Sequence, residues 1–383
     1  MVRRNTLPAA PTSATAGLFA RTRLWAEWLE PRDTPSAVAG EDVHSMPTLP
    51  GMGSQYPIDV QPPAPTVKAP LLQQVRGRYA VGTNGGGTAQ VNVYDARTGA
   101  MLGIVNPFGH NYRGAVSVAT GDVTGDGIAD IVVGAGQGRQ PTVKVFDGAT
   151  LREVASFDAY SATFKGGLTV AVGDVTGDGR ADVVTGAGLG SLSQVKVFDG
   201  RQLLPTATRM GAAVAVRNFV AFSDGFRGGV NVAAGDVDGD GKAEIAVSRQ
   251  RGTADVVVFG GASGKVVMTL ASTAATSGAT VAIGDVTGDG KAEIVTGSAA
   301  LNKSTVRVYG GTGGLKASHT AFAGNGGVNV AVRDTDGDGK AELIAGSGLN
   351  TPVGVKVIDA ASGTVERAFP AVGPWFRGGL SVG

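Results

Sequence analysis

The sequence contains no cysteine, so a disulfide framework, a thiolate metal site and a cysteine nucleophile are all excluded. Charged residues are sparse, at 17%, and nearly balanced, with a formal net charge of +1. Such a balance gives no general attraction to nucleic acid or to membranes. No apolar run approaches the roughly 20 residues that a membrane-spanning helix requires. We therefore expect neither a nucleic-acid partner nor a transmembrane segment.

Glycine, by contrast, is abundant, with 62 glycines among 383 residues. They follow no three-residue period, which excludes a collagen triple helix. Frequent glycines between many short apolar runs are typical of a β protein rich in turns. The first 75 residues differ, because they hold 11 of the 17 prolines and show no sustained strand or helix period. We interpret residues 1–75 as a leader and disordered linker, and residues 76–383 as one domain.

A repeated segment dominates that domain: Gly-Asp-Val-Thr-Gly-Asp-Gly or a close variant, then an acid and an apolar run. Successive copies lie 52, 62, 49 and 49 residues apart, and their first acids are Asp122, Asp174, Asp236, Asp285 and Asp334. A period near 50 fits a four-stranded propeller blade and is too long for the common helical repeats.

The second full unit shows the expected strands. Leu168–Val175 and Ala181–Thr185 flank the acidic segment, and Gln194–Phe198 follows, with a hairpin turn predicted at Asp199-Gly200. Residues 78–106 carry the second to fourth strands of a unit, and residues 376–383 carry a first strand alone. We therefore predict an all-β, six-bladed β-propeller in which N- and C-terminal strands share one blade and so close the ring.

The acidic loop has the form Asp-x-(Asp/Thr)-x-Asp-Gly-x-x-(Asp/Glu), which offers oxygen ligands at positions 1, 3, 5 and 9, as Ca²⁺ requires. An EF-hand would need flanking helices and a Glu at position 12, whereas a single loop of this kind could equally be a solvated turn. Five matching loops favour about five Ca²⁺ ions, with tightest binding at the Asp236 and Asp334 loops because those carry four acids. The expected ligands are Asp122, Thr124, Asp126, Asp130, Asp174, Thr176, Asp178, Asp182, Asp236, Asp238, Asp240, Glu244, Asp285, Thr287, Asp289, Glu293, Asp334, Asp336, Asp338 and Glu342.

This pattern resembles the FG-GAP/VCBS repeat family, whose best-known members are the propellers of integrin α subunits. The Phe-Gly part appears as Phe164–Gly167, Phe226–Gly229 and Phe376–Gly379. The resemblance implies a propeller with calcium between the first and second strands of each blade. Integrin propellers have seven blades and this count gives six, so the integrin partner does not carry over. Separately, Trp28-Leu29-Glu30-Pro31-Arg32 looks like the LEPR-type segment of some bacterial surface proteins.

Aromatic and basic residues recur on the rim opposite the acidic loops. A ligand-binding ring near the axis is one interpretation, and aromatic wedges between blades are the other; the candidates are Tyr112, Arg113, Lys165, Arg227 and Arg377. Only three histidines exist, and no nucleophile elbow, P-loop or zinc motif is present, so we expect no enzyme. The prediction is a monomeric, extracellular or cell-surface, calcium-binding adhesion module for a carbohydrate or protein partner. The alternatives are a polysaccharide lyase or hydrolase, or a purely structural surface element.

Overall fold

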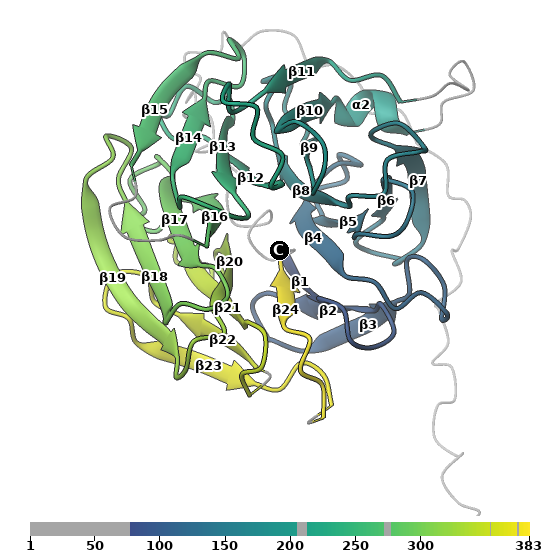
Figure 1. Cartoon of the computed structure of the whole chain (residues 1–383). Coiled ribbons are helices and arrows are strands. Elements are labelled where there is room, and N and C mark those ends of the chain that lie inside the picture. Colours follow the sequence, from purple (N-terminus) through teal and green to yellow (C-terminus); the bar gives the residue numbers. More distant parts are fainter. Residues whose placement is uncertain (1–76, 205–212, 272–276, 353, 374) are drawn as a thin grey trace, which may run out of the picture. The chain divides into compact units, whose positions relative to one another are not determined.

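The computed structural model describes residues 77–204, 213–271, 277–352, 354–373 and 375–383. These residues form six four-stranded antiparallel sheets set around a central axis (Figure 1). The predicted all-β, six-bladed propeller is therefore confirmed. The predicted leader and linker, together with the segment Trp28–Arg32, lie outside the described residues.

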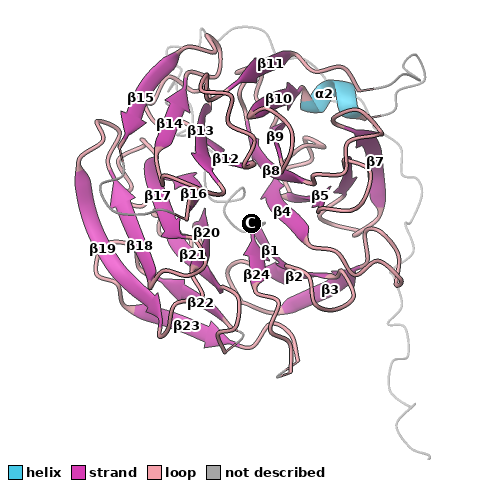
Figure 2. Ribbon diagram, viewed as in Figure 1, coloured by secondary structure: helices cyan, strands magenta, loops and turns pink. Residues whose placement is uncertain are grey.

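Five blades each use four strands that are consecutive in the chain (Figure 2). Blade 1 contains β4 (Val116–Gly121), β5 (Asp130–Ala135), β6 (Thr142–Phe146) and β7 (Glu153–Asp158). Blade 2 contains β8 (Leu168–Gly173), β9 (Asp182–Ala187), β10 (Gln194–Phe198) and β11 (Arg217–Val220). Blade 3 contains β12 (Val230–Gly235), β13 (Glu244–Arg249), β14 (Val256–Phe259) and β15 (Val266–Leu270). Blade 4 contains β16 (Ala279–Gly284), β17 (Glu293–Ser298), β18 (Ser304–Tyr309) and β19 (Leu315–Phe322), and blade 5 contains β20 (Val328–Arg333), β21 (Glu342–Ser347), β22 (Val355–Ile358) and β23 (Val365–Phe369).

The sixth sheet, here the closing blade, joins the two ends of the propeller. It consists of β24 (Leu380–Val382), β1 (Arg78–Thr83), β2 (Val91–Asp95) and β3 (Met101–Val105). Strand β24 pairs antiparallel with β1, with Leu380 opposite Thr83 and Val382 opposite Val81. This pairing confirms the predicted closure, in which one sheet takes strands from both ends of the propeller.

The hydrophobic core lies between neighbouring blades, because each sheet packs both faces against other sheets. One cluster joins Val91 and Val93 of the closing blade to Val118 and Ile131 of blade 1. The second strands are accordingly buried along almost their whole length, whereas the fourth strands are largely exposed at the outside of the ring. This gradient explains why the first and second strands are continuous apolar runs in the sequence.

A ring of polar side chains, here the polar belt, links all six first strands. Each member stands at the second position of its strand and bonds to the backbone of the next blade. Thr169 and Thr280 donate to Val230 O and Val328 O at 2.9 and 2.8 Å. Asn231 and Asn329 donate to Ala279 O and Leu380 O at 2.7 and 2.6 Å. The Oγ atoms of Ser117 and Ser381 instead accept from Val170 N and Val118 N, at 3.0 and 3.3 Å.

The belt is thus a closed circle of six hydrogen bonds between blades. It satisfies backbone groups on the innermost strands, which have no further strand to pair with. The belt residues line two hollows of the central channel, each of about 330 Å³.

One turn departs from the sequence prediction. Where a hairpin turn was expected at Asp199-Gly200, the chain forms a short helix, α2 (Gly200–Leu203). Asp199 caps it by accepting a hydrogen bond from Arg201 N, and Gly200 N donates to the buried Asp182. The hairpin prediction was wrong because a capping Asp followed by helix-compatible residues favours a helical turn. The described part of the chain contains no helix with the length and hydropathy of a bilayer span.

Candidate metal-binding loops and rim

All five acidic loops connect the first strand of a blade to its second strand. These loops lie together at one rim of the ring, because the backbone of each loop in blades 2–5 donates a hydrogen bond to the loop of the preceding blade. The aromatic–basic segments precede the first strands and therefore lie at the opposite rim. We call these the loop rim and the aromatic rim.

The first acid of each loop organises the turn. In the Asp236 loop, Asp236 Oδ1 accepts from Gly239 N and Asp240 N at 2.7 and 3.1 Å, and Oδ2 accepts from Gly241 N at 2.8 Å. Gly239 and Gly241 have φ angles of 83° and 86°, a region that favours glycine. The glycine at position 4, which the sequence interpretation overlooked, is thus as necessary as the one at position 6.

The last acid of each loop begins the second strand and is buried: Asp130, Asp182, Glu244, Glu293 and Glu342 are at most 5% exposed. Asp130 Oδ2 accepts from Thr124 N at 2.7 Å, and its Oδ1 accepts from Gly148 N at 2.9 Å. In Glu244 the hydrogen bond from Val237 N, at 2.9 Å, is accepted by Oε2. The Asp loops therefore tie both carboxylate oxygens to the backbone, while the longer Glu leaves one oxygen for other partners.

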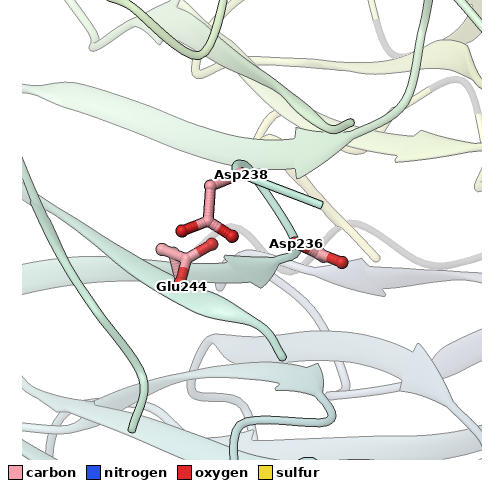
Figure 3. Close-up of side chains that lie close together, drawn as sticks. All are labelled: Asp236, Asp238 and Glu244. Carbon is pink, nitrogen blue, oxygen red and sulfur yellow. The ribbon is translucent and has the colours of Figure 1, made fainter. Parts of the chain in front are cut away.

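Two loops bring three carboxylates together. In the described part of the chain, ligand atoms of three acids lie within 4.8 Å of one another in Asp236, Asp238 and Glu244, and again in Asp334, Asp336 and Glu342. Figure 3 shows Asp238 and Glu244 turned toward each other beside Asp236. These are the two loops with an acid at position 3.

Basic side chains form ion pairs with acids of two of the three remaining loops. Arg201 Nε lies 2.9 Å from Asp178 Oδ2, and Lys316 Nζ lies 2.7 Å from Glu293 Oε1. None of the ion pairs among the described residues involves an acid of the Asp236 or Asp334 loop. Those two loops hold the most acid, and none of the ion pairs among the described residues neutralises them.

Burial raises the pKa values of the last acids Asp130, Asp182, Glu244 and Glu342. Loss of water raises the pKa of the Asp130 carboxyl to about 6 and also raises the pKa of Asp182. For Glu244 burial is again the main cause of a raised pKa, and the charges of the other three acids of its loop add to it. A bound cation would favour the charged forms of these acids and relieve this repulsion.

The family model for FG-GAP-like repeats matches residues 122–185, 236–296 and 285–345. Each match begins at the first acid of a loop, and together they contain all five loops. The chain is an FG-GAP repeat β-propeller. The oxygen-only donor sets of the Asp236 and Asp334 loops fit a hard divalent cation such as Ca²⁺.

Neighbouring loops of the FG-GAP propeller are also bonded to each other. The N–H at position 8 of one loop donates to the carbonyl at position 1 of the preceding loop, as Ala243 N does to Asp174 O at 2.7 Å. The basic residue at position 7 lies over the preceding loop, so a Cβ atom on Gly177 would come within 2.7 Å of Lys242. Ala181, Ala292 and Ala341 repeat the N–H contact. The loop rim is therefore a chain of linked loops.

On the aromatic rim the rings pack on the protein. The rings of Phe164 and Phe226 meet Tyr160 and Phe222 edge-on, at centroid distances of 5.8 Å each. Tyr112 packs in the same way against Phe108, at 5.4 Å. A Cβ on the glycine two residues further on would strike each of these rings. This packing is the wedge arrangement that the sequence left open.

The basic residues beside these rings are exposed: Arg113, Lys165, Arg227 and Arg377. The backbone carbonyls of Lys165, Arg227 and Arg377 accept hydrogen bonds from the neighbouring blade, at Gly138, Gly190 and Asn350. The channel mouth on this rim is lined by Gly166 and Gly167 but not by the basic side chains. Arg227 instead lines a recess of about 430 Å³ between blades, with Tyr160, Phe164 and Leu192.

Proposed function

We propose that this FG-GAP propeller binds Ca²⁺ at its loop rim, with the Asp236 and Asp334 loops as the tightest sites. The convergence of three carboxylates in these two loops carries the proposal. Calcium, when bound, supplies a divalent charge that neutralises the crowded acids. The three other loops offer fewer free carboxylates, because Arg201 and Lys316 already pair with two of them. We therefore place any further ions there at lower affinity.

Single-loop variants test this ranking. Calorimetric titration of Asp236→Ala and Asp334→Ala should each remove one tight Ca²⁺ site, whereas Asp122→Ala should leave both. Asp122 is a matched control because it makes the same three backbone contacts in its own loop. Equal losses in all three variants would refute the ranking, and unchanged titrations would refute the binding itself.

We further propose that the propeller is an exported binding module whose aromatic rim captures an acidic carbohydrate or a carboxylate-bearing protein partner. The recess between blades supports this, because it places Arg227 beside the rings of Tyr160 and Phe164. An aromatic face suits a sugar ring, and a guanidinium suits its carboxylate. Loops with only three or four carboxylates are expected to bind calcium with modest affinity, which suits the millimolar calcium found outside cells.

An array of acidic and neutral glycans and of extracellular matrix proteins, run with calcium and with chelator, tests the module. Retention should favour acidic ligands and fall at least tenfold in Arg227→Ala, with the exposed Arg152→Ala as the charge-matched control. Retention that is equal in the two variants would refute the recess as the site. New reducing ends in the bound polysaccharide would instead establish the lyase or hydrolase alternative.

A further inference from the structure

The pattern of the aromatic rim is interrupted between blades 4 and 5. The segments before β8, β12 and β24 end in Phe-(Lys/Arg)-Gly-Gly, at Phe164–Gly167, Phe226–Gly229 and Phe376–Gly379. The segment before β20 ends instead in Gly-Asn-Gly-Gly, at Gly324–Gly327. It therefore lacks both the aromatic ring that wedges beside the other blades and the basic residue that follows this ring.

A methyl group takes the place of the missing ring. In blade 2 a Cβ atom on Gly166 would strike the ring of Phe164. In blade 5 a Cβ atom on the equivalent Gly326 would strike the Cγ2 methyl group of Thr351. Because a methyl group is much smaller than a phenyl ring, the wedge is incomplete, and a pocket of about 530 Å³ opens beside Thr351. None of the described residues that line this pocket carries a charge.

Two turns beside the pocket adopt a conformation that normally requires glycine. The third residue after the second strand has a positive φ angle in every internal blade. It is a glycine in blades 1–3, but Leu301 and Asn350 take this position in blades 4 and 5, with φ angles of 74° and 57°. Both residues line the pocket, and the strained Leu301 is 85% exposed. Backbone strain of this kind is typical of functional sites.

Trp375 projects from the loop next to this pocket. It is 90% exposed, the highest value for a large apolar side chain in the described part of the chain. Its loop is bonded to the pocket wall, because Asn350 N donates to Arg377 O at 3.2 Å. Trp375, Leu301 and Leu349 thus form an exposed apolar patch around an open pocket. Such patches mark interaction sites, and an indole ring gains much from burial.

We propose that the propeller forms a two-fold dimer in which Trp375 of each copy enters the pocket beside Thr351 of the other copy. The second copy then supplies the ring that blade 5 lacks. A two-fold interface requires a surface that is complementary to itself. A projecting ring and a pocket side by side meet this requirement, because a two-fold axis between them sets each ring against the other copy's pocket. The monomer that the sequence led us to expect would leave both features exposed. The pocket and the Arg227 recess are lined by different residues, so the dimer does not depend on ligand capture.

Sedimentation velocity of the whole chain over a range of micromolar concentrations tests the dimer. We expect a dimer whose population rises with concentration. Trp375→Ala removes the ring and Thr351→Phe fills the pocket with one, so each should weaken the dimer by about tenfold or more, since each removes both contacts of a two-fold pair. Val267→Ala, which shortens an exposed apolar side chain on β15, is the control and should leave the dimer unchanged. A monomer at every concentration, or a dimer that survives both substitutions, would overturn the proposal.

A mixture of the two variants distinguishes this interface from any other cause of dissociation. In a mixed pair, Trp375 of the Thr351→Phe copy still meets the open pocket of the Trp375→Ala copy, so one of the two contacts remains. We therefore expect the mixture to associate more tightly than either variant alone. Equal association of the mixture and of the single variants would overturn the assignment to Trp375 and the pocket. Ala323→Phe, at an exposed residue that lines the pocket, replaces Thr351→Phe if that variant does not fold.

Discussion

The substitution Asp238→Asn should have opposite effects on stability with and without calcium. Asp238 is the exposed acid at position 3 of its loop, and its Oδ1 accepts a hydrogen bond from Asp240 N at 3.1 Å. Asparagine keeps that acceptor and the shape of the side chain but removes the charge. The loop geometry should therefore survive, and only the electrostatics should change.

In chelator the substitution removes repulsion between Asp238 and the acids Asp236 and Glu244. Their oxygens lie within 4.8 Å, which corresponds to about 1–2 kcal/mol per pair at an effective dielectric constant of about 40–80. Solvent screening at this exposed position lowers the gain to roughly 0.5–1 kcal/mol. Because about 1 kcal/mol shifts the Tm of a domain this large by about 2 °C, we expect a rise of about 1–2 °C.

In calcium the same change removes one of the converging ligands. At a Ca²⁺ concentration about 100 times the Kd, an intact site adds about 2.7 kcal/mol to the free energy of unfolding. Loss of most of that affinity would lower the Tm by about 4 °C. Thermal unfolding by circular dichroism in both buffers measures the two shifts, with Asp158→Asn on β7 as the control that should show no calcium dependence. Shifts of the same sign in calcium and chelator would refute the reasoning.

Two further predictions concern the ring and the aromatic rim. Asn329→Ala deletes the belt bond to Leu380 O and should lower the free energy of unfolding by about 1–3 kcal/mol, measured by urea denaturation; the exposed Asn111→Ala should not, and equal values would contradict a role in closure. Tyr160→Phe removes the buried hydroxyl that lies 3.0–3.1 Å from Thr185 and Gln194, so we expect a loss of about 1–3 kcal/mol without any change in calcium titration. An unchanged free energy of unfolding in Tyr160→Phe would show that these hydrogen bonds do not stabilise the fold.

The sequence predicted the blade count, the closure and the position of each acidic loop, because all three depend on a period that local residues set. A strand boundary such as Gln194–Phe198 follows from alternating apolar residues and a turn, and the structure reproduces it. The polar belt was also visible as a Ser, Thr or Asn at the second position of every first strand. The hydrogen bonds that these residues form could not be predicted, since five of them join residues 48 to 61 positions apart and the sixth joins residues 263 positions apart.

It was harder to predict from the sequence which loops have their acids paired with basic side chains. Asp178 and Glu293 look like ligands in the sequence, yet Arg201 and Lys316 reach them from a helix and from a fourth strand. Such pairs depend on how the outer elements fold back, which no local pattern records. The recess position of Arg227, away from the channel mouth, likewise follows from packing of the rings. These ion pairs are why we expect loops that share one motif to differ in their affinity for calcium.

We expect the acidic loops of this FG-GAP propeller to hold calcium, first of all at the Asp236 and Asp334 loops. Long-wavelength anomalous diffraction from crystals grown in millimolar calcium measures this most directly. We predict calcium peaks coordinated by Asp236, Asp238 and Glu244 and by Asp334, Asp336 and Glu342. An anomalous difference map with no calcium peak in either loop would contradict calcium binding at these sites.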